Sequence, residues 1–240
     1  MAQVAQLFRR RARPLRLKLR AYSPDGMGKS SKQWLRRHVT DAYVRKARSA
    51  GYRSRAAYKL LELDERERLF RPGAIVIDLG AAPGSWSQVA AERVRPGGKV
   101  IAVDLLEIAP ISGVTVLQGD FRDAKLLEAL EGRRADVILS DVLPNLSGIP
   151  NVDQARAAEL ANGALELCRK ALKSDGVFVL KAFHGEAFDE VLQRLKQDFG
   201  KVSVRKPEAS RGESRETYVV ARNQRKIPSS LQPQKTGASL

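Results

Sequence analysis

Residues 76–90 constrain the fold of this chain more than any other stretch of its sequence. They follow the start of an apolar, β-branched run at 74–79, which is typical of a buried parallel strand. The glycines and proline of residues 80–84 then predict a tight turn, followed by a helix that Ser85 or Ser87 is expected to cap. Such a loop lets the backbone approach a ligand at the carboxyl edge of a sheet. Its glycine spacing fits the dinucleotide fingerprint only loosely, so an ordinary structural turn is the alternative.

The next strand ends in an acid that narrows the choice of ligand. Residues 99–104 form a second apolar run that ends at Asp104, which lies 20 residues after Gly84. A carboxylate at that separation accepts the ribose hydroxyls of a bound nucleoside. Because the loop lacks a helix-capped cradle for a pyrophosphate, we expect an adenosine without phosphates. S-adenosylmethionine fits that description.

The rest of the chain continues as alternating strands and helices. We predict further strands at 114–118, 135–140, 176–181, 201–205 and 217–221, and helices at 31–50, 54–69, 123–130, 151–171 and 186–199. Alternating βα units of this kind predict a doubly wound parallel sheet. Since no helix separates the last two strands, we expect them to pair as an antiparallel hairpin.

Three separated motifs carry a resemblance to a known family. Asp78–Gln88, Gly119–Asp123 and Ser140–Asn145 resemble, in order, the motifs of the RrmJ/FtsJ family of ribosomal RNA 2′-O-ribose methyltransferases. The resemblance extends from about Ser31 to Ala221. It implies the α/β fold of class I S-adenosylmethionine-dependent methyltransferases, which is Rossmann-like, with a seven-stranded, mostly parallel sheet and helices on both faces.

The resemblance also implies which residues hold the cofactor. Gly84 and Trp86 would lie on its methionine and loop side, and Asp104 would bind its ribose. Asp120 would bind the amino edge of its adenine, and Asp141 would lie near its methionine ammonium. A helix cap is the alternative role for Asp120 alone, but three strand-end acids together favour a binding site.

The family's catalytic tetrad of lysine, aspartate, lysine and glutamate is matched by Lys59, Asp141, Lys181 and Glu216. A lysine that closes an apolar strand is costly unless paired, and Asp141 and Glu216 are the expected partners of Lys181. Lys181 would either remove the proton of the ribose hydroxyl or stay charged and stabilise the developing alkoxide. Neither role requires a metal. Val142 and Leu143 depart from the family's usual methionine and alanine, so a shift in substrate fit is expected there.

Composition favours a polyanionic partner. The 240 residues carry a net charge of +16, and +7 remains when the basic ends, 1–26 and 223–240, are set aside. Lysine and arginine bind the phosphates of nucleic acids favourably, because binding releases counterions. The single cysteine, Cys168, falls in an apolar helical run and excludes an internal disulfide, and no apolar run is long enough to span a bilayer.

We predict three regions in the chain. Residues 1–30 are interpreted as a basic, disordered arm, 31–222 as the methyltransferase domain, and 223–240 as a disordered tail. Within the domain, the basic residues of 31–70 are expected to contact RNA, although a solvated face is the alternative. Residues 1–20 alternatively form a mitochondrial transit peptide, or precede a true start at Met27. We expect a cytoplasmic protein, or a mitochondrial one if the transit peptide is real.

The expected function is methylation of a ribose 2′-hydroxyl, most simply that of a uridine in 23S ribosomal RNA. The expected partner is ribosomal RNA or the large ribosomal subunit, with no membrane and no metal, and the protein is expected to be a monomer. Two alternatives stay open: the same reaction on transfer RNA or another RNA, and an inactive RNA-binding ribosome-assembly factor.

Overall fold

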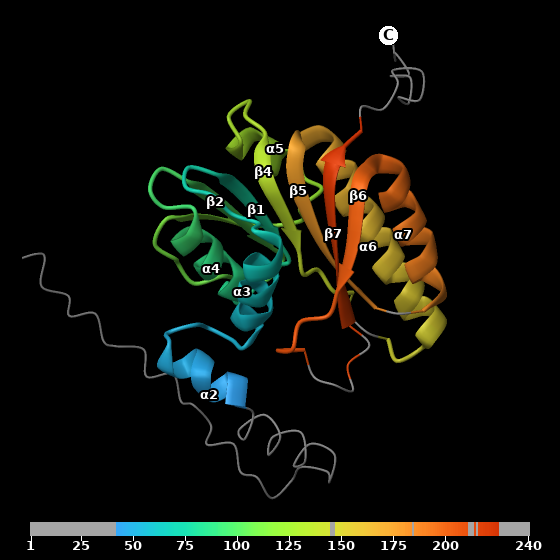
Figure 1. Cartoon of the computed structure of the whole chain (residues 1–240), viewed down its shortest axis with the longest axis horizontal. Helices are drawn as coiled ribbons and strands as arrows, with labels where there is room; N and C mark the ends of the chain where they lie inside the picture. Colours follow the sequence, from blue (N-terminus) through green and yellow to red (C-terminus); the bar gives the residue numbers. More distant parts are fainter. Residues whose placement is uncertain (1–41, 145–146, 184, 211–213, 215, 226–240) are drawn as a thin grey trace, which may run out of the picture. The chain divides into compact units, whose positions relative to one another are not determined.

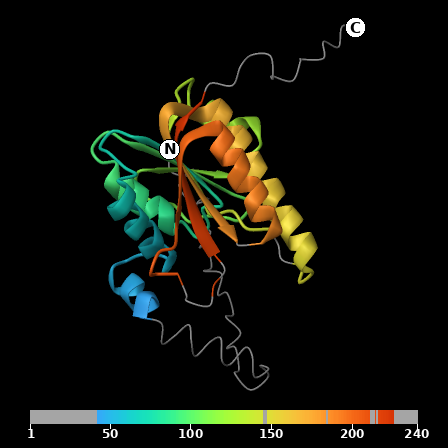
Figure 2. The ribbon, with the colours of Figure 1, turned by 45° about the vertical axis from the view of Figure 1, so that its right-hand side comes forward.

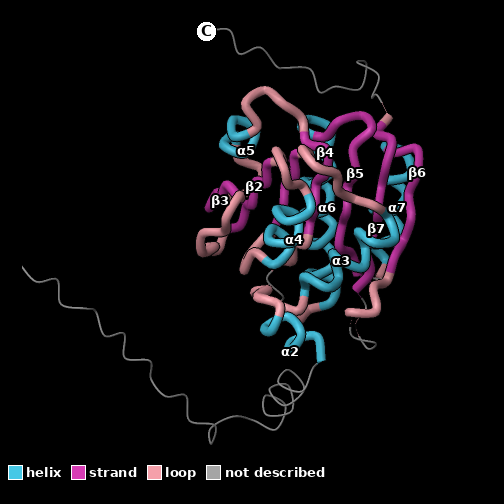
Figure 3. The backbone as a smooth tube through the Cα atoms, turned by 60° about the vertical axis from the view of Figure 1, so that its left-hand side comes forward, coloured by secondary structure: helices cyan, strands magenta, loops and turns pink. Residues whose placement is uncertain are grey.

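The computed structural model describes residues 42–144, 147–183, 185–210, 214 and 216–225. These residues form one sheet with helices on both faces (Figure 1). The seven strands are β1 (Ile75–Leu79), β2 (Lys99–Asp104), β3 (Val114–Gln118), β4 (Ala135–Ser140), β5 (Leu172–Phe183), β6 (Phe199–Arg205) and β7 (Glu216–Gln224). Their order is β3-β2-β1-β4-β5-β7-β6, so β3 and β6 form the two edges (Figure 3). Only β7 runs antiparallel to its neighbours in this part of the chain.

Six helices in the described residues come before or between these strands, in the order that the sequence predicted. They are α2 (Ala42–Ser49), α3 (Ala56–Glu67), α4 (Ser85–Arg93), α5 (Ala124–Ala129), α6 (Pro150–Ala171) and α7 (Glu186–Asp198). Figure 2 shows α6 and α7, in yellow and orange, on one side of the sheet and α3 and α4, in blue-green, on the other. The predicted seven-stranded methyltransferase fold is therefore confirmed, including the final antiparallel pair.

Side chains of β1 show how the sheet separates two core layers. Ile75, Ile77 and Leu79 pack in a cluster with side chains of α5, α6 and α7. Val76 points to the other face and packs with α3 and α4. Because successive side chains of a strand point to opposite faces, a strand buried on both faces needs the continuous apolar run that the sequence shows.

The topology gathers several strand ends at one edge. Leu79 of β1 is level with Val103 of β2 and Ser140 of β4, and Ser140 is level with Leu180 of β5. Since β7 runs antiparallel, its first residue, Glu216, lies at this same edge. Ligands of open α/β sheets bind outside the carboxyl ends of the parallel strands.

The prediction that Ser85 or Ser87 caps α4 is wrong. Gly84 occupies the cap position, and no side chain bonds the helix start there. The Ser85 hydroxyl instead lies 2.7 Å from that of Ser54, and the Ser87 hydroxyl donates to Asp78 Oδ2 at 2.6 Å. Both hydroxyls are committed to tertiary contacts that the local sequence does not reveal.

Several predicted boundaries differ from the observed ones. The strand predicted at 176–181 is longer at both ends, and the strand predicted at 217–221 runs from Glu216 to Gln224. The sheet therefore continues into the segment predicted as a tail from residue 223. Of the helix predicted at 31–50, the part before residue 42 lies outside the described residues, as do the arm at 1–30 and residues 226–240.

Cys168 is buried and unpaired, and burial raises the pKa of its thiol well above the usual value. Among the helices that the structure describes, none is both long enough and apolar enough to cross a bilayer. Within the same residues, His, Cys, Asp and Glu side chains nowhere gather in a group of three that could hold a metal ion.

Candidate active site

Four ionisable side chains meet at the edge where the strand ends gather. Lys59 comes from α3, Asp141 from the residue after β4, Lys181 from β5 and Glu216 from the start of β7. They are the residues that the sequence predicted as a tetrad, and they are separated by up to 157 positions in the chain (Lys59 to Glu216). The structure therefore brings all four together.

Ion pairs link the four side chains into one network. Lys181 Nζ lies 2.8 Å from Asp141 Oδ1 and 3.9 Å from Glu216 Oε2. Lys59 Nζ lies 2.5 Å from Glu216 Oε1, which also accepts a hydrogen bond from Ser210 Oγ at 2.8 Å. The side chains of Lys181 and Glu216 are buried, only 7% and 9% exposed. Two cations and two carboxylates balance, which is what permits their burial.

Burial and pairing shift the pKa values of this network in different directions. Burial lowers the pKa of Lys59, although its bond and charge contact with Glu216 act against that shift. Burial also raises the pKa of Asp141, with Lys181 opposing it. For Glu216, burial acts to raise the pKa, but the bond and charge of Lys59 outweigh it and hold that pKa below its usual value. A site of such coupled groups is typical of proton-transfer chemistry.

Beside the network lies a hollow of about 220 Å³ bounded by the glycine loop. Residues 80–83 and Ser85 form one wall, while Asp78 and Asp141 supply carboxylates. Gly84 has φ +104°, and a Cβ there would come within 2.5 Å of Ile111 Cδ1. Glycine at this position therefore keeps the turn close to the neighbouring loop.

Asp78, which was not predicted as a site residue, is fully buried at the back of this hollow. Its Oδ1 atom has no hydrogen-bond partner among the described residues. Burial raises the pKa of Asp78 to about 7 against the hydrogen bond from Ser87, and the charges of Asp141 and Asp104 add to the rise. An unpartnered carboxylate beside a second one fits a cationic ligand, and S-adenosylmethionine carries an ammonium and a sulfonium. The signal in the sequence was an acid two residues before the loop's first glycine.

The other two predicted acids lie at the ends of β2 and β3. Asp104 Oδ2 accepts the Ala82 N–H at 2.9 Å and Oδ1 accepts the Leu106 N–H at 2.8 Å. Asp104 thereby ties the glycine loop to the chain after β2 and keeps lone pairs for a further donor. Asp120 pairs with Arg122, whose hydrogen bonds hold the pKa of that carboxyl below its usual value.

Trp86 is placed differently from the other predicted cofactor residues. Its side chain is buried in the core, where Nε1 donates to the Ala56 carbonyl at 2.9 Å and the ring packs against Tyr218 at 5.7 Å between centroids. The indole therefore joins α4 to α3 and β7. Trp86 nevertheless lines the hollow from the first turn of α4.

Arg53, which precedes α3, forms a hydrogen bond to the backbone of the glycine loop. Its guanidinium donates to the Pro83 carbonyl at 2.7 Å and to the Pro110 carbonyl at 2.9 Å. Its backbone N–H donates to Gln88 Oε1 at 2.9 Å. The basic segment predicted to contact RNA is thus bonded directly to the loop predicted to hold the cofactor.

The tyrosines of this basic segment pack mainly on one another. The Tyr58 ring centroid lies 5.6 Å from that of Tyr43 and 6.0 Å from that of Tyr52. Lys46 Nζ lies 4.6 Å above the Tyr58 ring, and Tyr58 is buried. Tyr58 therefore serves packing.

Comparisons with a protein family and with known proteins agree with the methyltransferase site that this geometry suggests. Residues 52–224 match the family described as FtsJ-like methyltransferase. A protein of Nitrosospira multiformis named ribosomal RNA large subunit methyltransferase E is 50% identical, over 82% of this chain and 98% of its own. A protein of the same name from Chromohalobacter salexigens is 52% identical, over 80% of this chain and 94% of its own.

A solved structure is similar over much of the chain as well. A Plasmodium falciparum protein assigned as a ribosomal RNA methyltransferase superposes with a TM-score of 0.65 at 32% identity, covering 72% of this chain and 98% of its own. A Clostridium thermocellum structure with a TM-score of 0.51 at 17% identity, covering 69% of this chain and 96% of its own, supports the fold alone.

Proposed function

Because this chain belongs to the FtsJ-like methyltransferase family, we propose that it methylates a ribose 2′-hydroxyl of large-subunit ribosomal RNA, with S-adenosylmethionine as methyl donor. The relatives named ribosomal RNA large subunit methyltransferase E support the choice of RNA. The observation that carries the reaction type is the buried network of Lys59, Asp141, Lys181 and Glu216 beside the hollow of the glycine loop.

We assign the cofactor to that hollow. Asp78 and Asp141 would attract its ammonium, Asp104 would accept its ribose hydroxyls, and Asp120 would lie at its adenine edge. Gly84 and the backbone at Trp86 would line its methionine side. When bound there, S-adenosylmethionine supplies a methyl group carried on a positively charged sulfur.

The protein must then handle the proton of the ribose hydroxyl, which is a weak nucleophile. Lys181 lies at the carboxyl edge of the sheet and contacts both carboxylates of the network. With its amine neutral it accepts that proton; with its ammonium charged it stabilises the oxyanion as it forms. Asp141 and Glu216 orient it, and Lys59 neutralises Glu216 so that Lys181 is not held by two full negative charges.

The test is methyl transfer from labelled S-adenosylmethionine to three substrates: large ribosomal subunits that lack the modification, naked ribosomal RNA and transfer RNA. A ribose 2′-O-methyl group blocks alkaline cleavage of the next phosphodiester bond, so hydrolysis identifies the atom and the position. We expect one resistant bond in large-subunit RNA. Transfer to a base atom or to transfer RNA would refute the proposed substrate, and cofactor binding without transfer to any RNA would indicate an inactive RNA-binding factor.

A further inference from the structure

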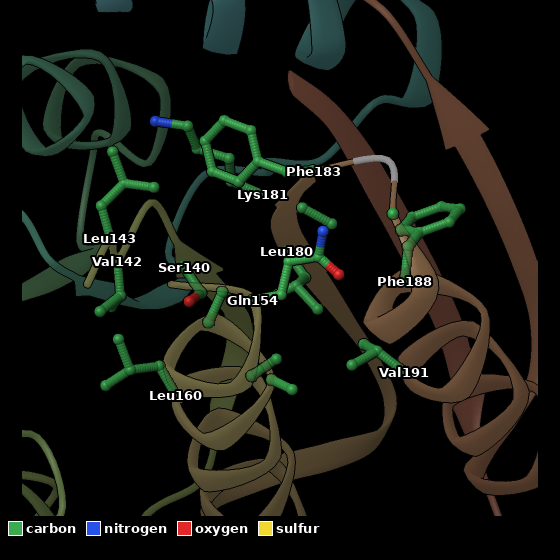
Figure 4. Close-up of a pocket in the computed structure, with 15 residues that line it drawn as sticks. Ser140, Val142, Leu143, Gln154, Leu160, Leu180, Lys181, Phe183, Phe188 and Val191 are labelled. Carbon is green, nitrogen blue, oxygen red and sulfur yellow. The ribbon is translucent and has the colours of Figure 1, made fainter. Parts of the chain in front are cut away.

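A second hollow lies next to the network and shares no residue with the first. The space between its walls is about 560 Å³, part of it open to solvent. Figure 4 shows its walls converging from the end of β4, from β5, and from α6 and α7. Lys181 lines this hollow and Asp141 lines the first, and these two side chains are paired at 2.8 Å. The network therefore stands between two separate spaces.

The wall between the two spaces is thin. Val142 lines the second hollow, and a Cβ added to Gly80 of the first would lie 2.8 Å from the Val142 Cα. In a methyl transfer the acceptor oxygen, the methyl carbon and the donor sulfur lie in line, so the acceptor approaches the methyl group from the side opposite the sulfur. With the donor in the hollow of the glycine loop, the second hollow is on the acceptor's side.

The lining of the second hollow is apolar except at a few points. Among its lining residues, Phe183 is 38% exposed and Leu143 is 47% exposed, so both present apolar surface to an incoming ligand. Lys181 Nζ lies 5.9 Å from the centroid of the Phe183 ring. Gln154 rises from α6 into the space and brings a primary amide to its lining.

We propose that this hollow receives the base of the nucleotide whose ribose is methylated, unstacked from the RNA, with Phe183 against its face and the Gln154 amide at its edge. This rests on the proposed function. Single-stranded bases are recognised in this way, by stacking on aromatic rings and by hydrogen bonds to their edges. The base and the 2′-hydroxyl are attached to adjacent carbons of one ribose, so a hydroxyl at Lys181 leaves its base within reach of Phe183.

A nucleobase fits this lining better than a purely apolar occupant does. The Gln154 amide offers both a donor and an acceptor, and the edge of a uracil offers both a carbonyl and an N–H. An apolar ligand would offer the Gln154 amide no hydrogen-bond partner, at added cost. Gln154 is then the residue that discriminates among bases, while Phe183 contributes stacking that any base accepts.

The experiment uses the RNA that the wild-type protein methylates, after the modified nucleotide has been mapped. Stacking of a base on an aromatic ring accounts for roughly 5- to 150-fold in affinity, so Phe183→Ala should lower kcat/KM for RNA by a factor in that range. Phe183→Tyr should restore most of it. Affinity for S-adenosylmethionine should be unchanged in both, and Val204→Ala, which truncates an equally exposed apolar residue on the far edge strand, should behave as wild type.

Changes to the mapped nucleotide then distinguish a base contact from a structural effect. On RNA with an abasic ribose at that position, wild type and Phe183→Ala should react equally. When the base is replaced by another, Gln154→Ala should discriminate less than wild type between the two RNAs. Equal losses on intact and abasic RNA, or unchanged discrimination by Gln154→Ala, would overturn the base pocket alone. If wild type methylates no RNA, the proposed function itself fails and the base pocket with it.

Discussion

At the scale of single residues, the site depends on charges that are buried only because they are paired. Lys181 has carboxylates at 2.8 and 3.9 Å, and Lys59 has one at 2.5 Å. Removing one member leaves its partner uncompensated, which costs more than the pair itself contributes. Substitutions here change both the chemistry and the remaining charges, so each needs a variant that separates the two.

Lys181→Ala should lower the rate of methyl transfer by about 10²- to 10⁴-fold, the usual loss for a general base. Binding of S-adenosylmethionine should persist, because Lys181 does not line the hollow of the glycine loop. Single-turnover rates and calorimetry measure the two effects. Lys173→Ala is the matched control, because that lysine also pairs with an aspartate at 2.7 Å but stands near the opposite end of β5.

Lys181→Arg separates the two roles of this lysine. Arginine keeps the positive charge but cannot accept a proton near neutral pH. Substantial activity in the arginine variant would indicate stabilisation of the alkoxide. A wild-type rate in the alanine variant would refute the assignment of the whole network.

Asp78 should make cofactor binding depend on pH. With its pKa raised to about 7, the free protein holds this carboxyl protonated below that pH, and a bound cation favours the ionised form. Affinity for S-adenosylmethionine should therefore rise between pH 5 and about pH 7 and level off above, with proton release on binding. Calorimetry in buffers of different ionisation enthalpy measures this release, and an equal release in Asp78→Asn would assign it to another group.

The same carboxyl affects the stability of the protein without ligand. Because folding raises the pKa of Asp78, the native state binds a proton that the unfolded chain has lost. The free energy of unfolding should thus fall as pH rises from about 4 towards 7, by at most about 1.4 kcal/mol per unit. Denaturant unfolding of the wild type and Asp78→Asn across this range gives the difference.

Asp104→Ala should weaken the binding of S-adenosylmethionine by about 1.5–3 kcal/mol, the range for hydrogen bonds to a charged group. Part of that loss reflects the Ala82 and Leu106 N–H groups that Asp104 now holds. Asp104→Asn keeps one acceptor oxygen, so its affinity for S-adenosylmethionine should lie between that of the wild type and that of Asp104→Ala. Unchanged affinity in the alanine variant, measured by calorimetry on folded protein, would exclude Asp104 from the site.

At the scale of elements, loops that follow different strands are packed against one another at the sheet edge. The glycine loop after β1 contacts Val142 after β4 and is held by Arg53 from before α3. Asp104 bonds it to the end of β2. The turns at the carboxyl edge therefore pack against one another. A methyl group added at Gly80 would have to displace the backbone of Val142.

Gly80→Ala should expose this dependence. Gly80 has φ +70°, and its Cβ would lie 2.8 Å from Val142 Cα and 2.9 Å from Val142 N. Gly132 has a similar φ of +74° but nothing within 4 Å, so Gly132→Ala carries only the backbone strain of about 1–2 kcal/mol. The clash should add about 1–3 kcal/mol for Gly80→Ala, measured by urea unfolding. Equal losses in the two variants would show that the loop yields without cost.

At the scale of the whole molecule, charge is concentrated towards the ends of the chain. Residues 1–26 carry seven basic residues and one acid, while 226–240 carry two basic residues. Such segments add affinity for RNA without specifying sequence, through release of counterions. The expectation of a monomer and that of a cytoplasmic location stay predictions.

Deleting residues 1–25 should weaken RNA binding and reduce its dependence on salt, while turnover at saturating RNA stays the same. Deleting residues 226–240, which removes only two positive charges, should have a smaller effect of the same kind. Filter binding across a salt series gives both slopes. A protein without residues 1–25 that binds RNA normally but no longer turns over would contradict the role of a basic arm.

The sequence by itself determined the βα order of the fold and the place of the glycine loop, while the tetrad followed from the family resemblance. Strands buried on both faces require uninterrupted apolar runs, and the glycine loop requires glycine, so both are visible in local sequence. Tertiary structure alone decided what depends on neighbours distant in the chain. The pKa of Asp78, the contacts of Ser85 and Ser87 and the burial of Trp86 all belong to this group. The second hollow belongs to this group too, because it forms only where β4, β5, α6 and α7 pack together, and no local sequence pattern predicts that packing.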